Sequence, residues 1–270
     1  MITWASVVVL AGFAVGAVLP VSVLPHDPTA TNLVDRFVAV GGTGVSGKSY
    51  ALGTDSLGRD VLARLLYAGR YTLLMAVGAA VVTTVFAVGL GVAAGYYRGT
   101  LEAVVLRAVD ALLSLPVILL AVALAAILGR GFGTLVTILA VTGWADYTRV
   151  VRADTIALRE RPFIESVQAL GADSGRVMFR HLLPNLASTV SVMSTYLIAR
   201  FILIESSISF LGMGIAPPAT SWGAMVGEAR QYIFEAPWVS VFPGLAITVT
   251  ILAVNFVGDA IRDRVDPTTR

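Results

Sequence analysis

The chain has 270 residues and a net charge of +2, and it is 57% hydrophobic but only 13% charged. Ordinary globular domains are about 45–50% apolar and about 25% charged, so this composition indicates a protein that resides in a lipid bilayer. The small net charge, without a basic stripe, argues against nucleic-acid binding. The chain has no cysteine, and neither His26 nor His181 has companions at metal-ligand spacing, so no metal site is expected.

Long charge-free runs predict an all-α polytopic membrane protein with six transmembrane helices. A spanning helix needs about 20 apolar residues, and runs that meet or approach this length cover residues 1–25, 71–97, 111–129, 182–199 and 236–258. The remaining span begins in the shorter run 131–145 and has to continue past Asp146 and Tyr147. No basic residue precedes the first run and no cleavage site follows it, so we expect a retained helix there rather than a signal peptide.

These spans divide the chain into three parts. We expect a first transmembrane helix over 1–24, an extracytoplasmic loop with an amphipathic helix over 25–70, and a five-helix core over 71–270 with a cytoplasmic loop at 151–184. Asp60 is expected to open the amphipathic helix, whose apolar residues would lie on the outer membrane surface: Val61, Leu62, Leu65 and Leu66. Cytoplasmic loops are enriched in Lys and Arg, and six arginines lie between 149 and 180 and three between 262 and 270. Both termini are therefore expected in the cytoplasm. Basic residues in the 25–70 loop argue against this orientation, but aspartates there offset them.

Residues 42–49, GTGVSGKS, satisfy the phosphate-binding pattern G-x-x-x-x-G-K-[ST]. In that site a helix begins at the Lys and Ser, so that its N-terminal amides face the phosphate. Here residues 50–55 have the composition of a turn, and the loop is too short for the parallel sheet and magnesium ligand of an NTPase. We therefore interpret the segment as a flexible Gly/Ser loop and set aside the nucleotide-binding alternative.

The cytoplasmic loop has the pattern of two helices joined by a glycine corner. Pro162 suits a first helical turn, and Phe163, Val167 and Leu170 then recur on one face of a short helix. Gly171 suits the positive φ that ends a helix, and Asp173 suits the N-cap of a second helix that runs towards Leu183. Such a unit either docks into a groove on a soluble partner or is an amphipathic connector lying on the membrane.

This loop resembles the E-A-A-x3-G-x9-I-x-L-P loop of ABC-transporter importer permeases, with matches at Glu165, Ala169, Gly171, Leu183 and Pro184. Ser166 and Val167 replace the two alanines, and His181 stands where Ile is usual. Further blocks are similar to the dipeptide/oligopeptide/nickel branch, including LGTDSLGRD at 52–60, RHLLPN at 180–185, SFLG at 209–212 and SWGAM at 221–225. These blocks run in order from about residue 52 to residue 267.

The resemblance implies a type I ABC importer permease fold and a place in a bacterial inner membrane. It implies import of di- or oligopeptides, or alternatively of nickel or another small ligand. The implied partners are a homologous second permease, two ATPase subunits or one fused ATPase, and an extracytoplasmic binding protein. ATP and Mg would be bound by the ATPases, so this chain would be neither an enzyme nor a cofactor-binding subunit. The ATPase-coupling residues are expected to be Phe163, Glu165, Val167, Ala169, Leu170, Gly171 and Pro184.

Charges within apolar spans are costly and mark candidate functional positions. Arg107 and Asp110 are three residues apart, as are Asp146 and Arg149, and this spacing predicts a pair along each helix. Arg200 and Glu205 are five apart, so each faces the path or a partner, or Arg200 meets an acidic group on another helix. The candidates for the translocation path are Asp110, Arg200 and Glu205.

Three residues near the extracytoplasmic side are possible contacts for the binding protein: Asp55, Arg59 and Trp222. Their alternatives are turn chemistry and, for the tryptophan, anchoring at the membrane interface. Pro116 and Pro243 are expected to kink helices around the path. A stand-alone secondary transporter or channel is the competing class, but it predicts internal repeats that the sequence lacks, and it leaves the 151–184 loop unexplained.

Overall fold

The computed structural model describes residues 23–265 and five earlier positions, Val8, Leu10, Gly12, Gly16 and Pro20. The predicted first transmembrane helix over 1–24 therefore lies almost entirely outside the described residues. Within those residues the chain is helical and forms no strand, as the all-α prediction requires. Its β contacts are isolated bridges, one between Thr43 and Ser49 and one between Thr54 and Asp60.

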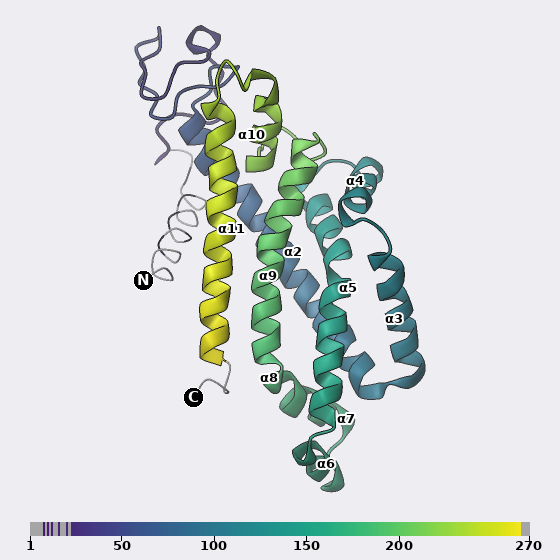
Figure 1. Ribbon diagram of the computed structural model, residues 1–270. Helices are drawn as coiled ribbons and strands as arrows, with labels where there is room; N and C mark the ends of the chain where they lie inside the picture. The colour runs from purple at the N-terminus through teal and green to yellow at the C-terminus, as the bar shows by residue number, and fades with distance from the viewer. Residues whose placement is uncertain are drawn as a thin grey trace.

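Among the described residues, six helices form the body of the molecule (Figure 1): α2 (Val61–Tyr97), α3 (Gly99–Leu113), α4 (Val117–Leu128), α5 (Phe132–Arg159), α9 (Ala187–Phe210) and α11 (Trp238–Val265). One end holds residues 23–60, with η2 (Leu33–Asp35), beside α10 (Trp222–Ala229) and η4 (Arg230–Tyr232). The other end holds α6 (Pro162–Ala169) and α7 (Ser174–Arg176), followed by η3 (Val177–Leu182) and α8 (Leu183–Asn185). We refer to these as the α10 end and the α6 end.

Three of the described helices are long and apolar enough to cross a membrane, namely α2, α9 and α11. The predicted span 71–97 lies within α2. The predicted spans 182–199 and 236–258 lie within α9 and α11, apart from their first few residues. The predicted span 131–145 lies within α5, which runs on past Asp146 to Arg159. α5 is not among the helices apolar enough to cross a membrane, because its second half contains charged residues.

The predicted span 111–129 is not one helix. α3 and α4 meet there at an angle of 89°, and together they count as a fourth candidate span. Pro116 is the N-cap of α4 rather than a kink inside a helix, because proline lacks an N–H and pushes the residue before it towards extended geometry. The 12 residues of α4 extend only about 18 Å, which is too short to cross a bilayer alone. Pro243, by contrast, lies inside α11.

The amphipathic helix expected on the membrane surface near residues 61–66 is instead the start of α2. Asp60 caps this helix, as predicted, because its side chain accepts hydrogen bonds from the backbone N–H groups of Leu62 and Ala63. Val61 and Arg64 are buried against the rest of the α10 end. The 37 residues of α2 extend about 55 Å at 1.5 Å per residue, so one helix links the two ends of the molecule.

Small residues allow α5 to pack closely against both α2 and α9. A Cβ on Gly91 of α2 would lie 2.7 Å from Val151 of α5, and one on Gly143 of α5 would lie 2.4 Å from the ring of Phe201 in α9. Close helix contact through small residues is typical of membrane proteins, where lipid supplies no hydrophobic drive for association. The core beside these contacts includes Met75 and Leu139, both fully buried.

Candidate functional site

The helix–corner–helix prediction for the 151–184 loop is confirmed at its corner. Pro162 occupies the first turn of α6, and Gly171 follows the helix with a φ of 85°. In that left-handed region any residue with a Cβ is strained, so glycine suits the position. Asp173 then caps α7 by accepting a hydrogen bond from the N–H of Arg176 at 3.3 Å. Glu165, Ala169, Gly171 and Pro184 are all exposed at this end.

The side chains of the predicted apolar stripe of α6 differ in exposure. Ile164, which the sequence interpretation missed, is fully buried in the core, and Val167 packs against the same cluster. Phe163 is 39% exposed and Leu170 is 87% exposed. The i, i+3 spacing of Ile164 and Val167 was the available signal for the inward face. The apolar side chains of this segment therefore fall into two groups: Ile164 and Val167 pack into the core, whereas Phe163 and Leu170 are exposed.

The second helix of the unit is irregular. α7 is one turn long, and residues 177–182 then form a π-helical turn before α8. Pro184 lacks an N–H to donate to the carbonyl of Arg180, and its ring crowds that carbonyl, which favours the wider turn. Val177 and Leu182 point into the core, whereas Phe179 is 73% exposed. Phe163, Leu170 and Phe179 are all exposed at the α6 end, and we refer to these three side chains as the apolar tip.

Tyr96, near the end of α2, ties this tip to the helical body. Its hydroxyl donates to Ser174 Oγ at 3.3 Å and accepts from Gln168 Nε2 at 3.4 Å. The guanidinium of Arg159 lies over its ring, 5.2 Å from the centroid. The tip is therefore linked through one aromatic side chain to both α2 and α5, a role that nothing in the sequence pattern indicated.

The charges in the long helices pair between helices rather than along them. Arg149 of α5 contacts Asp110 of α3 at 2.5 Å, and Arg200 of α9 contacts Asp146 of α5 at 2.7 Å. The predicted pairs Arg107–Asp110 and Asp146–Arg149 are therefore wrong, since each carboxylate faces a neighbouring helix. The alternative that Arg200 meets an acidic group on another helix is confirmed.

Glu205 is fully buried between α9 and α10. Ser209 donates to one of its carboxylate oxygens at 2.6 Å, while the other oxygen has no hydrogen-bond partner among the described residues. α10 lies very close here, because a Cβ on Gly223 would lie 2.4 Å from the backbone of Ser206. Glu205 is thus inside the protein at the α10 end and does not face an open path.

Two of the three predicted binding-protein contacts are buried at the α10 end. The side chain of Asp55 is 2% exposed and pairs with Arg59 at 2.7 Å and with the equally buried Arg64 at 2.5 Å. Glu228 of α10 completes the cluster by contacting Arg59 at 2.8 Å and Arg64 at 3.0 Å. This network joins the 52–60 block to α2 and α10. Asp55 is therefore a structural residue rather than part of a contact surface.

Trp222 is also buried, with no exposed surface. Its indole N–H donates to the carbonyl of Leu65 at 2.9 Å, and its ring lies against Gly69. The residue fastens the start of α10 to α2. It is therefore neither an interface anchor nor an open contact for a partner, and Arg59 alone of the three candidates lines an open cavity.

The phosphate-binding pattern at residues 42–49 folds around a carboxylate of its own chain. Asp35 is fully buried and accepts hydrogen bonds from the backbone N–H of Ser46 at 3.0 Å, from the Ser46 hydroxyl, and from the hydroxyl of Tyr50 at 2.9 Å. A Cβ on Gly44 would overlap the Asp35 carboxylate at 2.3 Å. Asp35 fills the space that a phosphate would need, and no helix follows Lys48.

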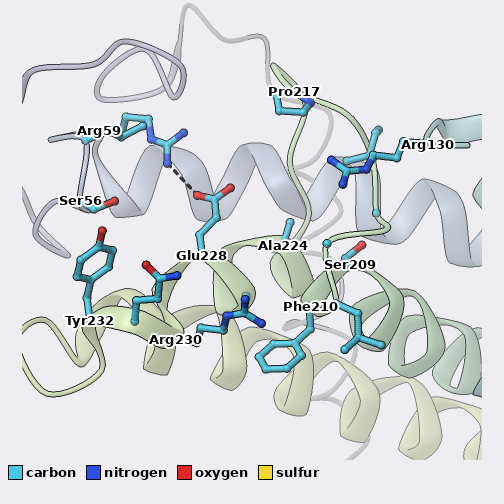
Figure 2. A pocket seen from close by; sticks show the side chains of 17 residues that line it. Ser56, Arg59, Arg130, Ser209, Phe210, Pro217, Ala224, Glu228, Arg230 and Tyr232 are labelled. Atoms are coloured by element: carbon cyan, nitrogen blue, oxygen red, sulfur yellow. Dashed lines mark hydrogen bonds and ion pairs between the residues drawn. The ribbon is translucent and has the colours of Figure 1, made fainter. Parts of the chain in front are cut away.

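A cavity of about 520 Å³ opens at the α10 end. Its wall comes from residues 56–59, from the α4–α5 turn at Arg130, from the end of α9 and the loop after it, and from α10 with η4. Figure 2 shows Arg130 on one side of the view, Ser56 and Tyr232 on the other, and Glu228 between them. We call this cavity the arginine pocket, because three arginines line it: Arg59, Arg130 and Arg230.

Comparison with known proteins identifies this architecture. Residues 87–270 match the family described as "Binding-protein-dependent transport system inner membrane component". The chain belongs to this family. It is therefore a multi-pass inner-membrane transport subunit rather than an enzyme, in a class of systems that work with a binding protein and an ATPase.

Relatives agree with that assignment, and a solved structure agrees with the fold. A glutathione transport system permease protein of Pectobacterium atrosepticum is 40% identical over 216 residues, which cover 80% of this chain and 72% of the relative. A putative peptide transport system permease protein of Brucella suis is 36% identical over 93% of this chain and 82% of its own length. A structure of the inward-facing MetNI methionine ABC transporter matches the fold with a TM-score of 0.61, at 20% identity over 75% of this chain and 96% of that chain. The predicted type I ABC importer permease fold is confirmed.

Proposed function

We propose that this chain is a permease subunit of an ATP-driven importer of di- or oligopeptides. The observation that carries the proposal is the apolar tip at the α6 end, exposed in the isolated chain and tied to α2 and α5 through Tyr96. Exposed apolar side chains that cluster at one end of a chain mark an interaction site for another protein or a membrane, and the match to a transport-system family favours a protein partner here. The relatives named for glutathione, which is itself a tripeptide, and for peptides favour peptide cargo over nickel.

In this proposal the tip docks on ATPase subunits, which hold the ATP and Mg, and the α6 end faces the cytoplasm together with both chain termini. The α10 end then faces the binding protein. A homologous second permease covers the helix faces that this chain leaves exposed, and the two permeases enclose the path. Closure of the ATPases pushes α6. The buried side chain of Ile164 and the contacts that α6 makes with Tyr96 then pass this movement to α2 and α5.

Uptake by the assembled complex tests this function. Both permeases, the ATPases and the binding protein are reconstituted in proteoliposomes, and uptake of a radiolabelled tripeptide is compared with uptake of nickel. We expect tripeptide uptake that requires both ATP and the binding protein, and no nickel uptake. Tripeptide uptake by this chain alone, without ATP, would show a stand-alone transporter, and nickel uptake would show the alternative cargo.

A further inference from the structure

The arginine pocket has the dimensions of a small-molecule site. Its volume of about 520 Å³ falls within the range of about 300–1,000 Å³ that is usual for ligand pockets. Four separate segments of the chain supply its wall, so it is a product of the fold rather than of one loop. The pocket lies at the α10 end, and Figure 1 shows this end opposite the α6 end. A ligand delivered from outside would first meet this subunit there.

The pocket carries uncompensated positive charge. Arg59 is neutralised by Asp55 and Glu228, and Glu228 also contacts Arg64. Arg130 and Arg230 are exposed, and across residues 23–265 no hydrogen bond or ion pair is found for either guanidinium. Two arginines without an acidic partner therefore border one cavity. Guanidinium groups bind carboxylates through paired, charge-assisted hydrogen bonds.

The remaining wall suits a peptide attached to such a carboxylate. Ser56, Gln231 and Tyr232 offer polar groups along the pocket, and the carboxylate of Glu228 is 46% exposed. Phe210 supplies an apolar surface on another side, as Figure 2 shows. A concave site with polar groups and an excess of cations fits a small zwitterionic ligand better than the convex surface of a docked protein.

We propose that the arginine pocket binds the C-terminal carboxylate of the peptide cargo through Arg130 and Arg230 when the binding protein releases it. This proposal rests on the proposed function of peptide import. It assigns to this permease a direct part in cargo selection, in addition to any selection by the binding protein.

The test compares trialanine with trialanine amide, which differ in the terminal carboxylate. Uptake is measured in phosphatidylcholine proteoliposomes with the full complex and with binding protein separately shown to be saturated by each peptide. The wild type is compared with Arg130→Gln/Arg230→Gln, and Lys48→Gln is the matched control because it removes a positive charge at the same end but outside the pocket. Arg130→Lys/Arg230→Lys keeps the charge but loses the paired geometry. Co-purification of the ATPases checks assembly of each variant.

We expect the double Gln variant to take up trialanine about tenfold more slowly, the size of effect for a lost charged hydrogen bond, with no change for the amide. The trialanine uptake rate of Arg130→Lys/Arg230→Lys should lie between those of the double Gln variant and the wild type. The uptake rate of Lys48→Gln should equal that of the wild type. The proposal would be overturned if the double Gln variant lost uptake of both peptides equally. It would also be overturned if the assembled double Gln variant took up trialanine as fast as the wild type. A wild-type complex that imports neither peptide would overturn the proposed function and this proposal with it.

Discussion

The charged side chains of the long helices act as ties between helices. Arg200 and Asp146 join α9 to α5, and Arg149 and Asp110 join α5 to α3. Sequence spacing alone favoured pairs along each helix, because three-residue spacing places two side chains on one face. It could not indicate which helix lies opposite that face. Only the suggestion that Arg200 meets another helix anticipated the arrangement.

The Arg200–Asp146 pair gives a prediction for stability. Arg200→Ala leaves Asp146 without its partner, and we expect a loss of about 1 kcal/mol, at the upper end for a partly exposed pair. The exchanged variant Arg200→Asp/Asp146→Arg should recover most of the loss. Thermal unfolding of the detergent-purified subunit measures both. An exchanged variant that is less stable than Arg200→Ala would contradict an electrostatic role for the pair.

Asp35 gives a prediction for pH dependence. The hydroxyl and N–H of Ser46 hold the pKa of the Asp35 carboxyl below its usual range. A carboxyl with a lowered folded-state pKa stabilises the fold above its unfolded pKa, and this stabilisation is lost as pH falls through the folded pKa. The 42–49 loop should therefore resist pepsin at pH 5 and open below about pH 4. At pH 5, pepsin should cleave Asp35→Asn faster than the wild type. When the pH is lowered further, the cleavage rate of this variant should rise less than that of the wild type. Equal pepsin profiles for the two proteins would contradict this role.

At the scale of elements, α6 shows what periodicity can and cannot predict. Its start at Pro162 and its end at Gly171 followed from backbone chemistry that is local, and both predictions are confirmed. The direction of its apolar face depended on the neighbouring helices, so Ile164 was missed. Pro116 was expected to kink a helix, whereas it is the N-cap of α4 and separates α3 from α4.

Ile164 and Leu170 should therefore respond differently to truncation. Ile164→Ala removes a fully buried side chain, which typically costs about 2–5 kcal/mol, and should release α6 from the body. Leu170→Ala removes a side chain that is 87% exposed and should change stability by less than about 0.5 kcal/mol. Limited trypsin cleavage after Arg159 or Arg176, on either side of α6, should accelerate in the first variant alone. Leu170→Ala is expected to lose co-purification with the ATPases without being cleaved faster. Rapid cleavage of Leu170→Ala would contradict the conclusion that Leu170 faces outward and Ile164 inward.

At the scale of the molecule, the sequence predicted the class and most of the helices because lipid requires long apolar segments. It was least informative at the two ends. Asp55 and Trp222 looked like surface contacts because their partners, Arg64 and Leu65, belong to a segment that was expected to lie on the membrane. The arginine pocket was missed because its residues are spread from Ser56 to Tyr232, so no local pattern brings them together.

In the proposed function, ATPase movement reaches the transport helices through α6, which is followed by the glycine corner at Gly171. The most direct test is peptide uptake per ATP hydrolysed in proteoliposomes containing Gly171→Pro or Gly171→Asp. Proline cannot adopt a φ of 85°, and aspartate there is strained by about 1–2 kcal/mol. Gly133→Asp is the matched control, because its φ is not positive and nothing lies within 4 Å of an added Cβ. We predict that both Gly171 variants insert at wild-type levels but lose coupled uptake, while the control retains it. Normal uptake per ATP by the Gly171 variants would contradict the account.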